Sequence, residues 1–251
     1  PEGEPVDDGY LAIVGPSLAR INQCSADFPF DDPAQKLVPP DVPFISLSSE
    51  SEMWQARYTH QPDAFTPGGG IVTYEVAGAS HRRHDIPGLA ADTITRPSPE
   101  DTIKAGVKPP DEPAADDNDF VWTPVIRGAF HNLQLWVRNG TRPPQAPGIE
   151  IDTNGEVRRD SYGNAQGGIR MPYIEAPVAT HTGYTATGGM GGIRGTKKPF
   201  SPELLRKLYP DLGAYVARFS AATDRLVSGR WISPEDAMAM KQAANSAPVP
   251  E

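Results

Sequence analysis

The sequence predicts an α/β fold in which a mostly parallel sheet is flanked by helices, with a small hairpin region and helices near the C-terminal end. Two observations carry this prediction. Two strand-sized runs, Val42–Leu47 and Ile71–Val76, are apolar along nearly their whole length, as strands covered on both faces must be. Segments with helical periodicity follow them and supply the covering layers that a parallel sheet requires.

Three strands are expected in the first part of the chain. Tyr10–Val14 is a short apolar run closed by a Gly-Pro pair, and we interpret it as a buried strand. Val42–Leu47 is the second strand. Ile71–Val76 is the third, preceded by three glycines and ended by an Ala-Gly pair. A connecting helix at about Met53–Tyr58 is expected between the second and third strands.

The chain is expected to form one domain in three parts. Residues 1–85 contain the strands of the sheet together with the loops that follow them. Residues 86–122 are rich in Pro and Asp with little periodicity, which is typical of a long loop or a lid-like insertion. Residues 123–251 contain a closing helix, the hairpin region and the C-terminal helices.

The closing helix is expected at Pro124–Asn139, with proline early in the helix and Gly140 just past its end. Its apolar side chains recur at helical spacing, which predicts that they face the core. These side chains are Ile126, Phe130, Leu133 and Val137.

The remaining segments carry turn and cap signals. Gly148–Pro177 contains the sequences Asn-Gly and Tyr-Gly-Asn, which favour hairpin turns with positive φ. Asp211–Ser228 has an inward apolar face, and Pro234–Ala244 follows Ser233, a preferred N-cap residue. The glycine-rich stretch Gly183–Gly195 is interpreted as a surface loop rather than a phosphate-binding loop.

Composition excludes several classes of function. The chain has 251 residues, 38 % of them hydrophobic, and a formal net charge of −9. Nucleic acid is not expected as a partner, because phosphate binding needs a basic face. The apolar runs are far shorter than the roughly 20 residues that span a membrane. Cys24 is the only cysteine, so no internal disulfide or multi-cysteine metal site can form.

Carboxylates and a histidine follow two neighbouring strands of the predicted sheet. Glu50 and Glu52 come shortly after the second strand, and His81 follows the third. Because the carboxyl ends of parallel strands meet at one edge of a sheet, we expect the acid and the histidine to converge there. A carboxylate beside a histidine is the arrangement that makes the imidazole an oriented general base. The spacing alone does not choose between Glu50 and Glu52 as the acid.

Two simpler interpretations compete with catalysis. A histidine after Gly-Ala-Ser at the end of a strand can simply cap a loop. His81 and His84, with Asp85 beside them, also suggest a metal site, but three suitably spaced ligands are not evident and no metal is expected.

Five stretches resemble a family of bacterial alpha/beta hydrolase domain-containing proteins, and the resemblance extends from about Gly9 to Ala244. Their order and spacing are more specific than any one of them. They are VPFISLSSESEM (42–53), YEVAGASH (74–81), HNLQLWVRNGTRPP (131–144), GNAQGGIRMP (163–172) and PFSPELLRKLYP (199–210).

The resemblance implies the C-terminal part of an α/β-hydrolase sheet and serine-type hydrolysis of a small carboxylic ester, without organic cofactor or metal. It places His81 at the histidine of the catalytic triad. The family's aspartate corresponds to Glu52, so this chain departs from the pattern by one methylene. Glutamate can replace aspartate in this role only if the backbone recedes by a similar length.

The sequence and the resemblance offer two positions for the nucleophilic serine. The resemblance implies a Gly-x-Ser-x-Gly elbow upstream of the segment 6–15, which places it before Pro1. The start at Pro1 rather than Met suggests an incomplete or processed polypeptide. Ser17 is the alternative nucleophile, since it follows the first strand within Gly-Pro-Ser-Leu-Ala. The preceding proline restricts the backbone of such an elbow.

Two functions follow from these alternatives. In the first, the chain is the C-terminal fragment or subunit of a serine-type esterase, and another N-terminal chain supplies the nucleophilic serine. In the second, it is a non-catalytic binding or interaction module that keeps a hydrolase scaffold without a nucleophile.

Overall fold

The computed structural model describes residues 7–14, 37–53, 62–81, 117–185 and 192–250. Several sequence expectations lie outside these ranges. They concern the connecting helix beyond Met53, most of the Pro/Asp-rich insertion, the candidate nucleophile Ser17, Cys24, and the His84 and Asp85 pair.

The centre of the molecule is a sheet whose described strands follow the order β1-β2-β4-β3, with β5 also paired to β4. β1, β2, β4 and β5 are mutually parallel, whereas β3 runs antiparallel to β4. The strands are β1 (Tyr10–Ile13), β2 (Pro43–Ser49), β3 (Ala64–Phe65), β4 (Gly70–Ala77) and β5 (Ile169–Arg170). The mostly parallel sheet predicted from the two apolar runs is therefore confirmed.

The two central strands carry the core of the sheet. Nearly every residue of β2 and β4 is buried, which agrees with the prediction that apolar runs are covered on both faces. β1 differs from the prediction of a buried strand, because Tyr10 is 39 % exposed and its other residues are only partly buried. It ends the described strand order, so β2 is its only described neighbour in the sheet.

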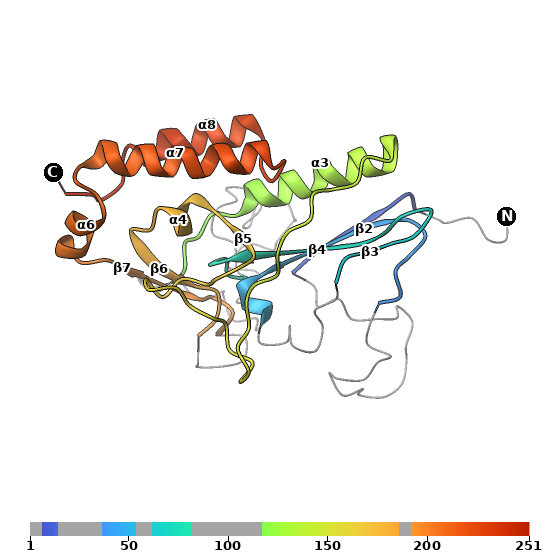
Figure 1. Ribbon diagram of the computed structural model, residues 1–251, viewed down its shortest axis with the longest axis horizontal. Helices are drawn as coiled ribbons and strands as arrows, with labels where there is room; N and C mark the ends of the chain where they lie inside the picture. The colour runs from blue at the N-terminus through green and yellow to red at the C-terminus, as the bar shows by residue number, and fades with distance from the viewer. Residues whose placement is uncertain (1–6, 15–36, 54–61, 82–116, 186–191, 251) are drawn as a thin grey trace, which may run out of the picture.

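Helix α3 (Thr123–Asn139) confirms the predicted closing helix, and Gly140 ends it in the left-handed conformation. Figure 1 shows it lying over one face of the sheet, roughly along the direction of β2 and β4. Its inward face is rotated from the predicted one: Leu133 is buried, but Phe130 is 52 % exposed.

Small and polar residues explain the rotation of α3. A Cβ at Gly128 would lie 2.0 Å from the carbonyl oxygen of Trp231, and the amide of Asn132 donates to the carbonyl of Arg230 at 2.9 Å. The helix thus contacts the loop before the last helix as well as the sheet. Hydrophobic periodicity could not mark that second contact, because glycine and asparagine are not apolar anchors.

The hairpin region folds as its turn signals predicted. Asp152 accepts backbone N–H groups of Asn154 and Glu156, and Gly155 has a φ of 85°. Asp160 repeats the arrangement eight residues later, with Gly163 at a φ of 79°. Short antiparallel bridges connect the arms, such as Ile151 with Val157.

The C-terminal part is helical, as predicted, with additional short elements. Asp211 and Ser233 cap the last two helices by accepting backbone N–H groups. Figure 1 shows these two helices side by side. The elements of this part are α4 (Pro172–Glu175), β6 (Ala179–Thr182), β7 (Thr196–Pro199), α6 (Pro202–Leu208), α7 (Leu212–Ser228) and α8 (Pro234–Ala244). β6 and β7 form a separate antiparallel pair. They flank the glycine-rich stretch Gly183–Gly195 and were not expected from the sequence.

Candidate active site

The carboxyl ends of β2 and β4 lie side by side, since Ser49 pairs in register with Val76. The chain leaves β2 through a single 3-10 turn, η2 (Glu50–Glu52), for which Ser49 is the N-cap. It leaves β4 through Gly78, which has a φ of 79° and lets the strand turn sharply towards His81. The two loops that follow the strands therefore approach each other at one edge of the sheet.

Glu52 and His81 meet at this edge. Oε1 of Glu52 lies 2.6 Å from Nδ1 of His81. Oε2 accepts the backbone N–H and the hydroxyl of Ser49, each at 2.7 Å. The first of these two contacts, together with the Ser49 side chain that accepts the backbone N–H of Glu52, forms a capping box. The Ser49 side chain also accepts the N–H of Ser51 at 3.2 Å. The turn after β2 thus holds the Glu52 carboxylate in the orientation in which it contacts His81.

Burial and hydrogen bonding give the two partners different surroundings. The Glu52 side chain is 11 % exposed, whereas that of His81 is 38 % exposed. A carboxylate only accepts hydrogen bonds, so the proton of a neutral His81 ring belongs on Nδ1 in this contact. The lone pair is then on Nε2. That tautomer is the one that an imidazole needs to act as a general base.

Ser51 anchors the loop that contains His81 through a hydrogen bond to the backbone of that residue. Its hydroxyl oxygen accepts the N–H of His81 at 2.7 Å and donates to the carbonyl of Gly183. The hydroxyls of Ser49 and Ser51 are therefore both engaged in the scaffold of the Glu52–His81 pair.

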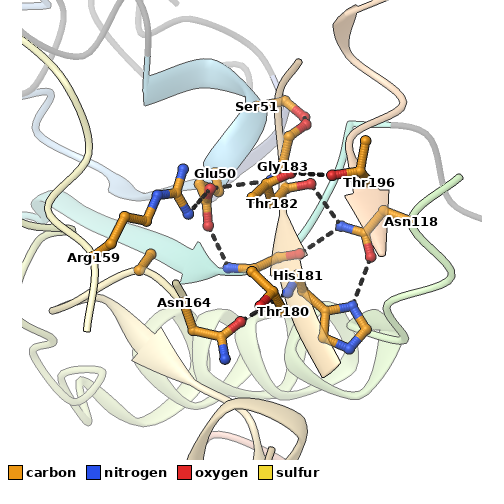
Figure 2. Close-up of polar contacts among 12 residues, drawn as sticks. Glu50, Ser51, Asn118, Arg159, Asn164, Thr180, His181, Thr182, Gly183 and Thr196 are labelled. Atoms are coloured by element: carbon orange, nitrogen blue, oxygen red, sulfur yellow. Dashed lines mark hydrogen bonds and ion pairs between the residues drawn. The ribbon is translucent and has the colours of Figure 1, made fainter. Parts of the chain in front are cut away.

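Glu50 occupies a different position from Glu52. Its carboxylate is 1 % exposed and accepts the N–H of Gly78 at 2.7 Å and that of Gly183 at 3.0 Å. Arg159 completes the arrangement with an ion pair at 2.6 Å (Figure 2). Glu50 thus connects the end of β4, the end of β6 and the hairpin region, while Glu52 faces the imidazole.

Asn118 and His181 extend this network, and the sequence analysis did not single out either residue. The Asn118 amide donates to the carbonyls of Gly78 and Thr182 at 2.7 and 3.1 Å. Its oxygen lies 3.0 Å from Nδ1 of His181 (Figure 2). The two residues are 63 positions apart, and neither lies in a recognisable motif, so no local signal could have paired them.

Burial lowers the pKa of His181 to about 4. The nearby charges of Asp119, which raises the pKa, and Lys197, which lowers it, have smaller effects. The folded protein therefore keeps this imidazole neutral, whereas in the unfolded chain it takes up a proton near pH 6.5.

This shift predicts a specific loss of stability in acid. Between pH 6.5 and pH 4 the unfolded state binds one more proton at this site, so the free energy of unfolding falls as the pH is lowered. From pH 7 to pH 4.5 the contribution is about 2 kcal/mol. Urea unfolding at the two pH values should show this loss in the unmodified protein but not in His181→Gln. His131→Gln, at an exposed histidine of α3, is the control and should lose as much as the unmodified protein. An equal loss in His181→Gln would contradict the assignment.

No group of three or more His, Cys, Asp or Glu side chains suited to a metal ion occurs within the described residues. No helix in the described ranges is long and apolar enough to cross a membrane.

Comparison with known protein families shows that residues 1–242 match a family described as an alpha/beta hydrolase domain. No curated protein and no solved structure matches the chain.

Proposed function

We propose that this chain, which belongs to the alpha/beta hydrolase domain family, supplies the acid and the base of a serine-type carboxylic ester hydrolase. Glu52 is the acid in this proposal and His81 is the base. The observation that carries it is the 2.6 Å contact between Oε1 of Glu52 and Nδ1 of His81 at the carboxyl edge of the sheet. Family membership supports the hydrolase scaffold, and the contact supports the assignment of roles.

The proposed reaction has two steps. Nε2 of His81 takes the proton of a serine hydroxyl while the serine oxygen attacks the ester carbonyl. The leaving alcohol receives this proton when the ester C–O bond breaks. A water molecule then attacks the acyl-enzyme, giving its proton to Nε2, and the serine regains a proton as the acid is released. In each step Glu52 stabilises the imidazolium that forms transiently.

The nucleophile of this proposal is a serine outside the described residues. The two serines of the turn after β2 are engaged, since Ser49 binds Glu52 and Ser51 binds the His81 N–H and Gly183. The candidates are Ser17 and a serine of another polypeptide segment that completes the sheet. A small-molecule ester is the proposed substrate.

Labelling with a fluorophosphonate, a reagent that phosphonylates activated serines, tests this proposal. The native material, with any polypeptide that accompanies it, is labelled and the modified peptide identified by mass spectrometry. We expect one labelled serine, with labelling abolished in His81→Ala and preserved in the control His131→Ala. Absence of a labelled serine in folded material would reject the esterase and favour a non-catalytic binding module.

A further inference from the structure

A cavity of about 220 Å³ lies between α7, α8 and the segment that leads to β6. Aromatic side chains form much of its wall, and His181 is also part of the wall. The aromatic residues are Phe120, Tyr173, Tyr215 and Phe219. Neither Glu52 nor His81 lines the cavity, so it is separate from the proposed acid and base.

The imidazole of His181 offers a hydrogen-bond acceptor at this cavity. The oxygen of Asn118 can only accept, because its nitrogen donates to the carbonyls of Gly78 and Thr182. Nδ1 of His181 must therefore carry the proton in the contact with Asn118, which leaves the lone pair on Nε2. Figure 2 shows Nε2 on the side of the ring turned away from Asn118.

His181 is only 5 % exposed. Nδ1 bonds to Asn118, whereas Nε2 has no hydrogen-bond partner among the described residues. The ring of His181 lines the cavity, and Nε2 is its remaining acceptor. An acceptor left unsatisfied in an apolar site is unfavourable, and a donor brought by a ligand removes that cost.

Size and ring geometry narrow the class of ligand. Phe120 meets His181 edge to face, with ring centroids 5.2 Å apart, and meets Tyr173 in the same way at 5.4 Å. Rings arranged like this favour a further aromatic ring. A cavity of about 150 Å³ with an apolar lining is known to hold benzene, so a volume of 220 Å³ accommodates one ring with one polar substituent.

The charges around the cavity narrow the class of ligand further. His181 is neutral at physiological pH, because burial lowers its pKa. The charged groups that line the cavity are Asp119 and Lys197, which neutralise each other in an ion pair at 2.7 Å. A neutral hydrogen-bond donor therefore suits the cavity better than a carboxylate.

We propose that this cavity is a binding site for a small neutral aromatic alcohol of the phenol class, whose hydroxyl donates to Nε2 of His181. The site goes beyond the proposed ester hydrolysis and does not depend on it. Binding can be measured without turnover, so failure of either proposal leaves the other open to test.

Titration of the full-length protein with phenol, followed by NMR chemical shifts, tests the site. Toluene is the matched ligand, since a methyl group of similar size replaces the hydroxyl. We expect saturable phenol binding and toluene binding at least tenfold weaker, as the loss of one buried hydrogen bond implies. Equal affinity for the two ligands, or no saturable binding of phenol, would overturn the proposal.

Two variants locate the site. His181→Phe should abolish the preference for phenol over toluene, because the acceptor is removed while a ring remains. Ala247→Phe, at a partly buried position on the cavity wall, should abolish binding of both ligands, and it tests the site even if His181→Phe does not fold. His131→Phe, on the exposed side of α3, should bind phenol normally. Undiminished phenol binding in folded Ala247→Phe would contradict the assigned location.

Discussion

Replacing His81 with alanine is expected to lower kcat/KM for p-nitrophenyl acetate by a factor on the order of 10⁵ to 10⁶ in the active enzyme, as loss of a triad histidine does elsewhere. The physical reason is the removal of the only group proposed to accept the proton of the serine. The side chain is 38 % exposed, so the variant should still fold, with a loss of about 1 kcal/mol in the free energy of unfolding because Oε1 of Glu52 loses its hydrogen bond to the imidazole. The measurement is the initial rate of ester hydrolysis together with a urea unfolding curve.

The matched control is His131→Ala, which removes a histidine from the exposed face of α3. It should leave both the hydrolysis rate and the unfolding curve as they are. If His81→Ala kept near-normal turnover in folded protein, His81 would not be the base.

Replacing Glu52 with glutamine is expected to lower kcat by a factor on the order of 10⁴. The carboxylate faces donors at both oxygens: the N–H of Ser49 at Oε2 and the imidazole of His81 at Oε1. A glutamine oxygen that keeps the Ser49 contact turns its NH₂ group towards Nδ1 of His81. The imidazole must then accept at Nδ1 and carry its proton on Nε2, which is the wrong tautomer for a base.

Glu50→Gln is the informative comparison, because the residue lies two positions away and is even more buried. Its partners are Gly78, Gly183 and Arg159, so glutamine leaves the guanidinium and one N–H poorly matched. We expect a loss of about 3 kcal/mol in the free energy of unfolding and a much smaller loss of kcat than in Glu52→Gln. The reverse ranking of the two kcat values would make Glu50 the acid.

The sheet and the place of the candidate site could be predicted from the sequence because both depend on local signals. Runs that are apolar on both faces identified β2 and β4, and parallel pairing brings their carboxyl ends together. The convergence of Glu52 with His81 follows from that topology. The choice between Glu50 and Glu52 could not be made, because it depends on where the extended backbone stops. β2 continues to Ser49 and a 3-10 turn follows, so the two carboxylates point to different partners.

The hydrogen bonds of Glu50 and Asn118 could not be predicted from the sequence because they join residues that are far apart in the chain. Glu50 binds Gly183, which is 133 residues away, and Asn118 binds His181, which is 63 residues away. Such contacts arise only when the β6–β7 pair lies against the end of β4, and β6 and β7 have no apolar run that marks them as strands. The inward face of α3 was misplaced because it contains glycine and asparagine, which hydrophobic periodicity does not register.

Glu52, and not Glu50, contacts the imidazole of His81 in the structure. The most direct measurement is the NMR resonance of the His81 Nδ1 proton, which a short hydrogen bond to a carboxylate shifts downfield. We predict that this resonance is present in the unmodified protein and in Glu50→Gln and is lost or moved upfield in Glu52→Gln. A resonance that survives Glu52→Gln but disappears in folded Glu50→Gln would contradict the claim.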